Sequence, residues 1–301
     1  MNWLIVGGTG QLGLALSNEL NGRRISHNSV NSKELDISDS LAVDKFIQLL
    51  KPEVIINAAA WTDVDGAETH QVRAFEVNSQ GALNLAVAAK DLNAIFVQIS
   101  TDFVFSGASI EPWDEYSPHN PISVYGSSKS QGEFLVGNEY RERTYIVRTA
   151  WLYSANRKNF AKTMIKLALL DHREVRVVND QVGQPTFAGD LAKQIVDLVV
   201  SKLPFGVYHA TNSGQVSWFD FSREIFKLVG ADTNRVTPIS SLELQRPAKR
   251  PPYSVLGHNA WNGTSVSPMQ NWKNALAYSL PMIISSVKLE GLSHENNTTK
   301  Y

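Results

Sequence analysis

A tyrosine followed by a lysine four positions later is the residue pair in this sequence best suited to proton transfer. Of the nine tyrosines in the chain, only Tyr125 has a lysine, Lys129, at this spacing. On a helix the spacing places both side chains on one face. A phenol has an ordinary pKa of about 10, and a neighbouring ammonium stabilises the phenolate and lowers that pKa. The pair predicts that Tyr125 is a general acid tuned by Lys129, with a chance surface pair as the alternative.

The hydroxyl of Thr101 follows a predicted strand over residues 95–98. Open α/β sheets bind their ligands at the carboxyl ends of the strands. Thr101 is therefore expected to polarise a substrate carbonyl beside Tyr125, which gives a catalytic set of Thr101, Tyr125 and Lys129. The plainer interpretation is that Thr101 and Asp102 only close a turn.

Three glycines spaced by three join the apolar run at residues 3–6 to a run of helical period. Glycines at a strand-to-helix junction let the backbone approach a pyrophosphate, which the helix N-terminus then faces. The pattern predicts a dinucleotide site in which Lys129 holds the nicotinamide ribose. Three alanines, at positions 58–60, follow the strand at 54–56, and their small side chains let the backbone come equally close to the cofactor. The expected contacts are Gly7, Thr9, Gly10, Gln11, Leu12, Gly13, Ala58, Ala59 and Ala60.

The segment at residues 29–33 bears on the choice of cofactor. A carboxylate that closes the second strand would repel a 2′-phosphate, and none occurs here before Glu34. Neutral Asn31 and Ser32 beside Lys33 favour NADPH over NADH. The alternative is a solvated loop, with both cofactors accepted. Asp36, next to Ile37, is expected to cap the following helix or to approach the adenine.

Short apolar runs alternate with longer runs of helical period in the first half of the chain. The apolar runs cover residues 3–6, 54–56, 95–98 and 145–147, and the helical runs include 11–20 and 74–89. This rhythm predicts a doubly wound α/β fold of the Rossmann type, with a parallel sheet covered by helices. After residue 150 the rhythm loosens. We expect a dinucleotide-binding domain over 1–150, to which later segments can return, and a smaller α/β substrate lobe over 151–301.

Composition narrows the classes of function. The 301 residues carry a formal net charge of -1, which gives no basic field for nucleic acid or an anionic membrane. The chain has no cysteine, its seven histidines lack metal-ligand spacing, and no apolar run reaches the roughly 18 residues of a membrane span. We therefore expect a cytoplasmic protein without a metal. Aromatic residues with amphipathic helical spacing are expected to pack in the core: Trp218, Phe219, Phe221 and Phe226.

Taken in order, these motifs resemble the extended short-chain dehydrogenase/reductase family, and in particular its dTDP-4-dehydrorhamnose reductases. The resemblance spans nearly the whole chain. It rests on the glycine-rich turn and on the segments at residues 34–39, 57–60, 64–68, 100–105, 125–133, 148–151, 159–160, 179–186 and 250–256. It implies NADPH-dependent reduction of the C4 ketone of dTDP-4-dehydro-β-L-rhamnose to dTDP-β-L-rhamnose.

The resemblance also implies roles for single residues. The sugar pocket would be lined by Thr62, Val64, Asp102, Phe103 and Trp151, together with Thr101 and Tyr125. Phe103 replaces a tyrosine that is common in the family, which removes one hydroxyl but keeps an apolar wall. Asn78 is a candidate cofactor contact, although a structural role on its helix is the simpler interpretation.

Some family members bridge a dimer through magnesium held by a carboxylate two residues after the third glycine. The residue at that position here is Ala15. We therefore expect a monomer or a weak homodimer without such a metal bridge.

Two other functions stay open for the same fold. A nucleotide-sugar 4-epimerase would keep its cofactor through the cycle instead of consuming NADPH. A 4,6-dehydratase is disfavoured because Asp102 is followed by Phe103 and not by a second acid. A non-catalytic NADP-binding regulatory subunit, similar to methionine adenosyltransferase beta, would have no need of Tyr125 and Lys129.

Overall fold

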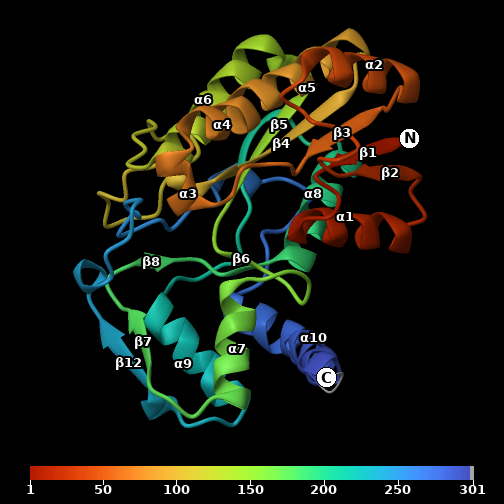
Figure 1. The fold of residues 1–301 in the computed structure, drawn as a ribbon. Coiled ribbons are helices and arrows are strands. Elements are labelled where there is room, and N and C mark those ends of the chain that lie inside the picture. The colour runs from red at the N-terminus through yellow and green to blue at the C-terminus, as the bar shows by residue number, and fades with distance from the viewer. Residues whose placement is uncertain (299–301) are drawn as a thin grey trace.

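The computed structural model describes the backbone of residues 1–298 and the side chains of residues 1–290. Its main sheet has six parallel strands in the order β10-β5-β4-β3-β1-β2 (Figure 1). These strands are β1 (Trp3–Val6), β2 (His27–Val30), β3 (Val54–Asn57), β4 (Ile95–Thr101), β5 (Thr144–Thr149) and β10 (Gly206–His209). The chain reverses its direction of growth between β1 and β3, and such a reversal opens a ligand crevice at the carboxyl ends of the strands.

Helices cover both faces of this sheet because its strands are apolar on both faces. In β1 the side chains of Trp3 and Ile5 pack in one core, whereas Leu4 and Val6 pack in another on the opposite face. The first core includes residues of α1 (Gln11–Gly22) and α8 (Ala188–Val200). The second is covered by α2 (Ser40–Leu50), α5 (Gly81–Asp91) and α6 (Val124–Glu139), which lie together above the sheet in Figure 1.

The doubly wound fold expected from the sequence is confirmed, and the four expected apolar runs are β1, β3, β4 and β5. The expected run of helical period over residues 74–89 is confirmed, because this range is helical throughout. The helix contains an irregularity that the sequence did not predict: the π-helical turn η1 (Glu76–Gln80) lies between α4 (Gln71–Phe75) and α5, after the short α3 (Val64–Thr69). Single π-helical turns often occur at functional sites, because the extra residue redirects a side chain.

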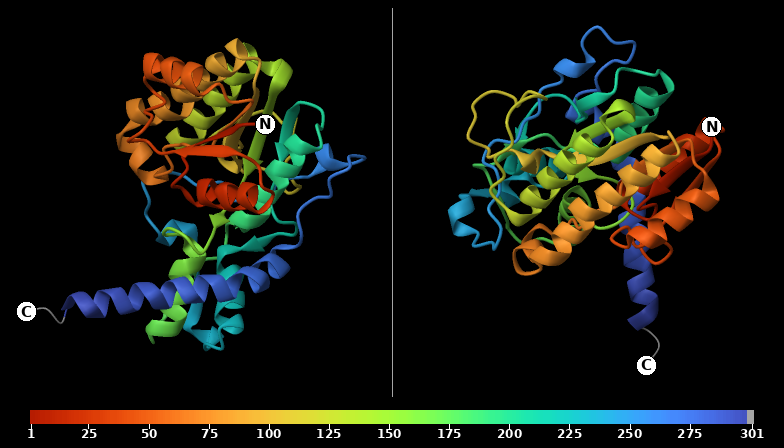
Figure 2. Two further views of the ribbon diagram at one scale, coloured as in Figure 1. Left: turned by 90° about the vertical axis from the view of Figure 1, so that its right-hand side faces the viewer. Right: turned by 90° about the horizontal axis from the view of Figure 1, so that it is seen from above.

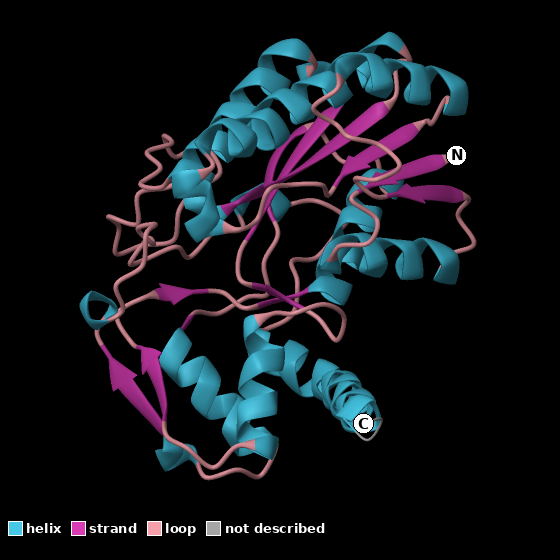
Figure 3. Cartoon of the chain, viewed as in Figure 1, coloured by secondary structure: helices cyan, strands magenta, loops and turns pink. Residues whose placement is uncertain are grey.

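A second lobe lies below the main sheet and contains only short strand pairs and helices (Figure 3). The strand pairs are β6 (Leu152–Tyr153) with β9 (Thr186–Phe187), β7 (Val175–Val178) with β12 (Val236–Ile239), and β8 (Val182–Gly183) with β11 (Val216–Ser217). Its helices are α7 (Phe160–Leu170), α9 (Trp218–Leu228) and α10 (Trp272–Thr298), around a core of their own. Between them the chain returns through α8 and β10 to the main sheet.

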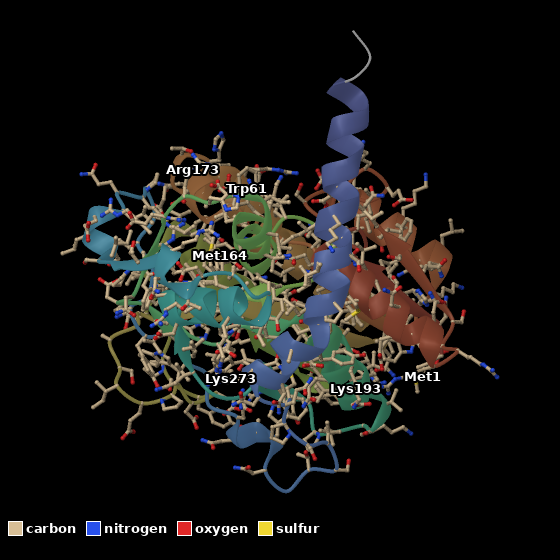
Figure 4. The ribbon with its side chains drawn as sticks, turned by 90° about the horizontal axis from the view of Figure 1, so that it is seen from below. Met1, Trp61, Met164, Arg173, Lys193 and Lys273 are labelled. Carbon is tan, nitrogen blue, oxygen red and sulfur yellow. The ribbon has the colours of Figure 1, made fainter. Side chains whose placement is uncertain are left out.

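Five short 3₁₀ turns connect these elements in the described chain: η2 (Asp102–Val104), η3 (Arg141–Arg143), η4 (Thr233–Arg235), η5 (Ser241–Glu243) and η6 (Asn259–Trp261). The helix α10 projects away from the body of the molecule in Figure 2, and Figure 4 shows it from below in front of the other elements. Within residues 1–298, no helix is both long and apolar enough to cross a bilayer.

Candidate active site

A cavity of ≈1580 Å³ lies at the carboxyl ends of the main strands and is lined by both lobes. Its walls come from the glycine-rich turn after β1, the ends of β3, β4 and β5, the first turns of α6 and α7, and the segment at residues 241–251. A pocket for one small ligand usually has a volume of roughly 300–1,000 Å³. The cavity is therefore larger than one small ligand requires and has the volume for two.

The glycine-rich turn forms one end of this cavity. Gly7 has φ +85°, and a Cβ there would lie 2.6 Å from the backbone nitrogen of Ala59 and 2.7 Å from the carbonyl carbon of Ala58. Only glycine allows the turn and the loop after β3 to approach so closely. Gly10 is the N-cap of α1 and has no side-chain cap, so the first N–H groups of the helix are free to bind an anion.

The predicted cofactor contacts in this region divide into two groups. Those that line the cavity are Gly7, Thr9, Gly10, Gln11, Leu12, Asn31, Ala58, Ala59 and Ala60. Gly13, Asp36, Ile37 and Asn78 do not line it. A Cβ at Gly13 would lie 2.3 Å from the carbonyl oxygen of Gly7, so this glycine lets α1 pack against the turn. Direct contact of these four residues with the cofactor stays a prediction.

The segment after β2 places neutral groups at the cavity. Asn31 and Ser32 line it. The carboxylate of Glu34 accepts a hydrogen bond from the backbone nitrogen of Asn31 at 2.8 Å. Asp36 accepts from Ser38 and forms an ion pair with Arg73 at 3.0 Å.

The expectation that Asp36 caps the next helix is wrong, because Asp39 accepts the hydrogen bond from Ala42 at the start of α2. Asp36 is instead occupied by its bonds to Ser38 and Arg73, one turn before the helix begins.

Asn78 ties three segments together from the π-helical turn. Its amide oxygen accepts from the backbone nitrogen of Trp61 at 2.8 Å, and its amide nitrogen donates to the carbonyl oxygen of Trp61 and to the hydroxyl of Ser128. The side chain is 2% exposed. These bonds fix the loop after β3 relative to α6, which carries Tyr125 and Lys129.

Thr101, Tyr125 and Lys129 all line the cavity. Ser123 caps α6 by accepting from the backbone nitrogen of Gly126, and a Cβ at Gly126 would lie 2.3 Å from the carbonyl oxygen of Phe103. The glycine therefore lets the first turn of α6 pack closely against the 3₁₀ turn η2 that follows β4. The rings of Tyr125 and Phe103 meet edge to face with centroids 5.5 Å apart.

The protonation of Tyr125 and Lys129 is set mainly by burial. Burial raises the pKa of Tyr125 to about 12, while a hydrogen bond with Thr101 acts in the opposite direction. Burial lowers the pKa of Lys129 to about 8, against the attraction of Glu133. The Lys129 ammonium donates to the carbonyl oxygen of Ile99 at 2.6 Å. The expectation that Lys129 brings the Tyr125 pKa down is wrong for this structure, and the phenol holds its proton at neutral pH.

Asp102 brings a buried carboxyl to the same wall. It is 2% exposed, and burial raises its pKa to about 6 although hydrogen bonds with Ser254 and Thr101 lower it. Its Oδ1 accepts from the Thr101 hydroxyl at 3.0 Å, whereas Oδ2 is buried without a partner. A buried acceptor left unpaired costs free energy until a donor arrives.

Replacing Asp102 with asparagine is expected to change how stability depends on pH. A carboxyl with a raised pKa binds its proton more tightly in the folded state, so its contribution to stability is lost as pH rises from about 4 through about 6. Over that window the wild type should lose on the order of 2–3 kcal/mol that D102N does not lose. Urea unfolding at a series of pH values measures this. Parallel pH curves for the two proteins would contradict the assignment.

Aromatic side chains form the wall on the side of the second lobe. Trp151, at φ +46°, stacks on Trp218 with centroids 3.4 Å apart, and Phe160 packs against Trp218 at 4.4 Å. All three line the cavity. A Cβ at Gly183 would lie 2.5 Å from the Trp151 ring, so this glycine makes room for the indole.

The sequence-based expectation of core packing for the α9 aromatics is confirmed: Phe221 and Phe226 are buried, and Trp218 and Phe219 are partly buried and pack against the same core. Trp218, the first residue of α9, also lines the cavity, which the sequence did not predict. Its pairing with Trp151 depends on the distance between two lobes, which helical spacing does not encode.

The predicted sugar contacts Thr62, Val64, Asp102, Phe103 and Trp151 line the cavity. Sequence reasoning missed a set of cations that also line it: Arg157, Lys158, Arg176, Arg246, Lys249 and Arg250. Asp102 is the one carboxylic acid among the lining residues of the described chain. The cavity is therefore electropositive, although the net charge of the whole chain is -1. The only early signal was the cluster of basic residues between positions 246 and 250.

Comparisons with known proteins place this geometry in a family. The chain is 42% identical over 285 residues to a dTDP-4-dehydrorhamnose reductase of Streptomyces griseus, with 93% of each chain covered. It is 40% identical over 281 residues to a dTDP-4-keto-6-deoxy-D-glucose reductase of Streptomyces niveus, covering 93% of this chain and 97% of the relative.

A solved structure agrees with these relatives. The dTDP-4-dehydrorhamnose reductase of Bacillus anthracis, in complex with NADP, is 38% identical and superposes with a TM-score of 0.89 over 93% of this chain and 98% of its own. The family model described as RmlD substrate binding domain matches residues 1–283, nearly the whole of the described chain. The protein therefore belongs to the RmlD substrate binding domain family.

Proposed function

We propose that the protein is an NADPH-dependent oxidoreductase that reduces the C4 ketone of dTDP-4-dehydro-β-L-rhamnose to the hydroxyl of dTDP-β-L-rhamnose. One observation carries this proposal: Thr101, Tyr125 and Lys129 line the same cavity as the glycine-rich turn. The names of the relatives from Streptomyces griseus and Streptomyces niveus support a keto-sugar carried on dTDP as the substrate.

The residues present fit a dinucleotide. The close approach of Gly7 to Ala58 and Ala59 leaves a cradle that a Cβ would fill, and the uncapped N-terminus of α1 opens into the cavity. Asn31 and Ser32 place no carboxylate in the lining, which supports NADPH over NADH. When bound, the nicotinamide supplies the hydride for the carbonyl carbon. The NADP complex of the relative from Bacillus anthracis is consistent with this cofactor.

The proton is supplied by this chain's own residues. The Tyr125 phenol is protonated at neutral pH and donates to the carbonyl oxygen, which becomes the new hydroxyl. In this structure the Thr101 hydroxyl donates its one hydrogen to Asp102 Oδ1, and on sugar binding it turns to donate to the same carbonyl oxygen and polarises it. Lys129 is mainly an ammonium near neutrality and is available to hold the ribose hydroxyls of the cofactor.

We assign substrate binding mainly to the residues after 150, where Trp151 and the cations of the second lobe contact the dTDP-sugar. Thr62, Val64, Asp102 and Phe103 are assigned to the sugar from the first lobe. An electropositive lining complements the diphosphate of such a substrate and the phosphates of the cofactor. We also propose a cytoplasmic location and a monomer or weak homodimer.

Purified protein should oxidise NADPH only when a dTDP-linked 4-keto-6-deoxy sugar is present, with one NADPH consumed for each sugar reduced. Absorbance of NADPH and chromatography of the sugar product measure the two quantities. Parallel assays with dTDP-4-dehydrorhamnose and dTDP-4-keto-6-deoxyglucose identify the preferred epimer. Sugar interconversion without net NADPH loss would contradict reduction and indicate an epimerase, and absence of both would contradict an enzyme of this class.

A further inference from the structure

The carboxylate of Asp65, on α3, is hydrogen-bonded to a segment of the second lobe that is far away in the sequence. Asp65 Oδ1 and Oδ2 accept from the two terminal nitrogens of Arg250 at 2.6 and 2.7 Å. Asp65 Oδ1 also accepts from the backbone nitrogen of Ala248 at 3.2 Å, and Arg250 donates to the carbonyl oxygen of Ala248 at 2.7 Å. Asp65, Ala248 and Arg250 are thus all hydrogen-bonded to one another, although Asp65 lies 183 to 185 positions before the other two in the sequence.

Helix α3 is also hydrogen-bonded to the start of α6, the helix that carries Tyr125 and Lys129. One turn after Asp65, the carboxylate of Glu68 accepts from the backbone nitrogen of Val124 at 2.9 Å, directly before Tyr125. Val64, directly before Asp65, lines the cavity. Helix α3 therefore joins the first turn of α6 to the segment at residues 246–250.

That segment contributes charge to the cavity. Arg246, Lys249 and Arg250 line it, and Arg246 lies 3.8 Å from Asp65. Three cations within five residues repel one another unless an anion lies among them. Asp65 does not line the cavity itself, so its effect on a ligand acts through the residues it holds.

We propose that Asp65 is a positioning residue for substrate binding, which holds the 246–250 segment so that Arg246 and Lys249 face the diphosphate of the nucleotide sugar. The inference rests on the proposed function for the nature of that ligand. A bidentate carboxylate–guanidinium pair fixes direction as well as distance, so neither a neutral amide nor a lysine reproduces it. The bond to Arg250 lowers the pKa of Asp65, and the pair therefore stays charged across the neutral range.

Two variants test the pair, D65N and R250K. Each should raise the Kd for dTDP, used as an unreactive probe, and the KM for the keto-sugar by about tenfold or more, with kcat changed by less than about threefold. The Kd for NADPH should stay within about twofold of wild type, because the glycine-rich turn lies on other elements. The double variant should be little worse than either single one, since both remove one interaction.

A matched control is D171N, which breaks a bidentate pair with Arg173 that lies within the second lobe away from the cavity. D171N should leave the Kd for dTDP, the KM for the keto-sugar, kcat and the Kd for NADPH unchanged. The inference would be overturned if D65N and R250K bound dTDP with wild-type affinity and had a wild-type KM. It would also be overturned if these variants lost as much affinity for NADPH as for dTDP, or if the two effects were additive in the double variant.

Hydrogen exchange separates this inference from the proposed function. In the protein without ligands, D65N should speed amide exchange in the 241–250 segment while leaving β1 and α1 unchanged. Unchanged exchange in that segment would overturn the positioning role even if the enzyme is active. If exchange in that segment is faster in D65N but the wild-type protein reduces no keto-sugar, the positioning role is supported and only the proposed function is contradicted.

Discussion

Replacing Tyr125 with phenylalanine is expected to lower kcat for keto-sugar reduction by about two orders of magnitude or more. Among the side chains that the structure describes, Tyr125 carries the one phenol that lines the cavity; the change removes its hydroxyl proton and keeps the ring that packs against Phe103. The hydroxyl of Thr101 can still polarise the carbonyl, so some turnover should remain. Steady-state rates of NADPH oxidation, with NADPH binding measured separately, check both statements.

The matched control for this prediction is Y116F. Tyr116 is 86% exposed and does not line the cavity, so the same loss of a hydroxyl should leave kcat unchanged. The Kd for NADPH should be near the wild-type value in both variants. Near-normal turnover in Y125F would remove Tyr125 from the role of general acid, and a large loss of NADPH affinity would show that its main role lies in binding.

Replacing Gly7 with alanine is expected to weaken both the fold and cofactor binding. Its φ of +85° disfavours an L side chain, and the added Cβ would lie 2.6–2.8 Å from backbone atoms of Ala58 and Ala59 that cannot rotate away. The free energy of unfolding should fall by about 2 kcal/mol or more. The Kd for NADPH should rise at least about tenfold, since the turn must move from the position that cradles the pyrophosphate.

Gly22 provides the control, because it ends the same helix and no atom lies near the Cβ it would gain. G22A should bind NADPH normally and be equally stable or slightly more stable. Urea unfolding and fluorescence titration with NADPH measure the two effects. If G7A bound NADPH as tightly as wild type, the glycine-rich turn would not be the cofactor cradle.

The sequence was informative where a function depends on local spacing. The glycine-rich turn lies at a strand-to-helix junction, and Tyr125 and Lys129 lie on one face of α6. Runs apolar on both faces predicted the parallel sheet, and Thr101 ends β4 as expected. Each of these features is determined within a few residues of chain, so periodicity and glycine placement were enough.

The features that the sequence did not reveal depend on the distance between segments far apart in the chain. The pKa of Tyr125 rises because several elements bury the phenol together, an effect that the spacing to Lys129 cannot show. The stack of Trp151 on Trp218 and the bond of Asp65 to Arg250 both join distant segments. The electropositive cavity was hidden by a net charge close to zero.

The most direct test of the catalytic arrangement is a crystal structure of the protein with NADP and dTDP-rhamnose bound together. The account predicts that the Tyr125 phenol oxygen and the Thr101 hydroxyl both lie within about 3 Å of the sugar C4 oxygen, with Lys129 on the nicotinamide ribose. A complex in which the C4 oxygen lies beyond hydrogen-bonding reach of the Tyr125 phenol, with another acid beside it, would contradict the account.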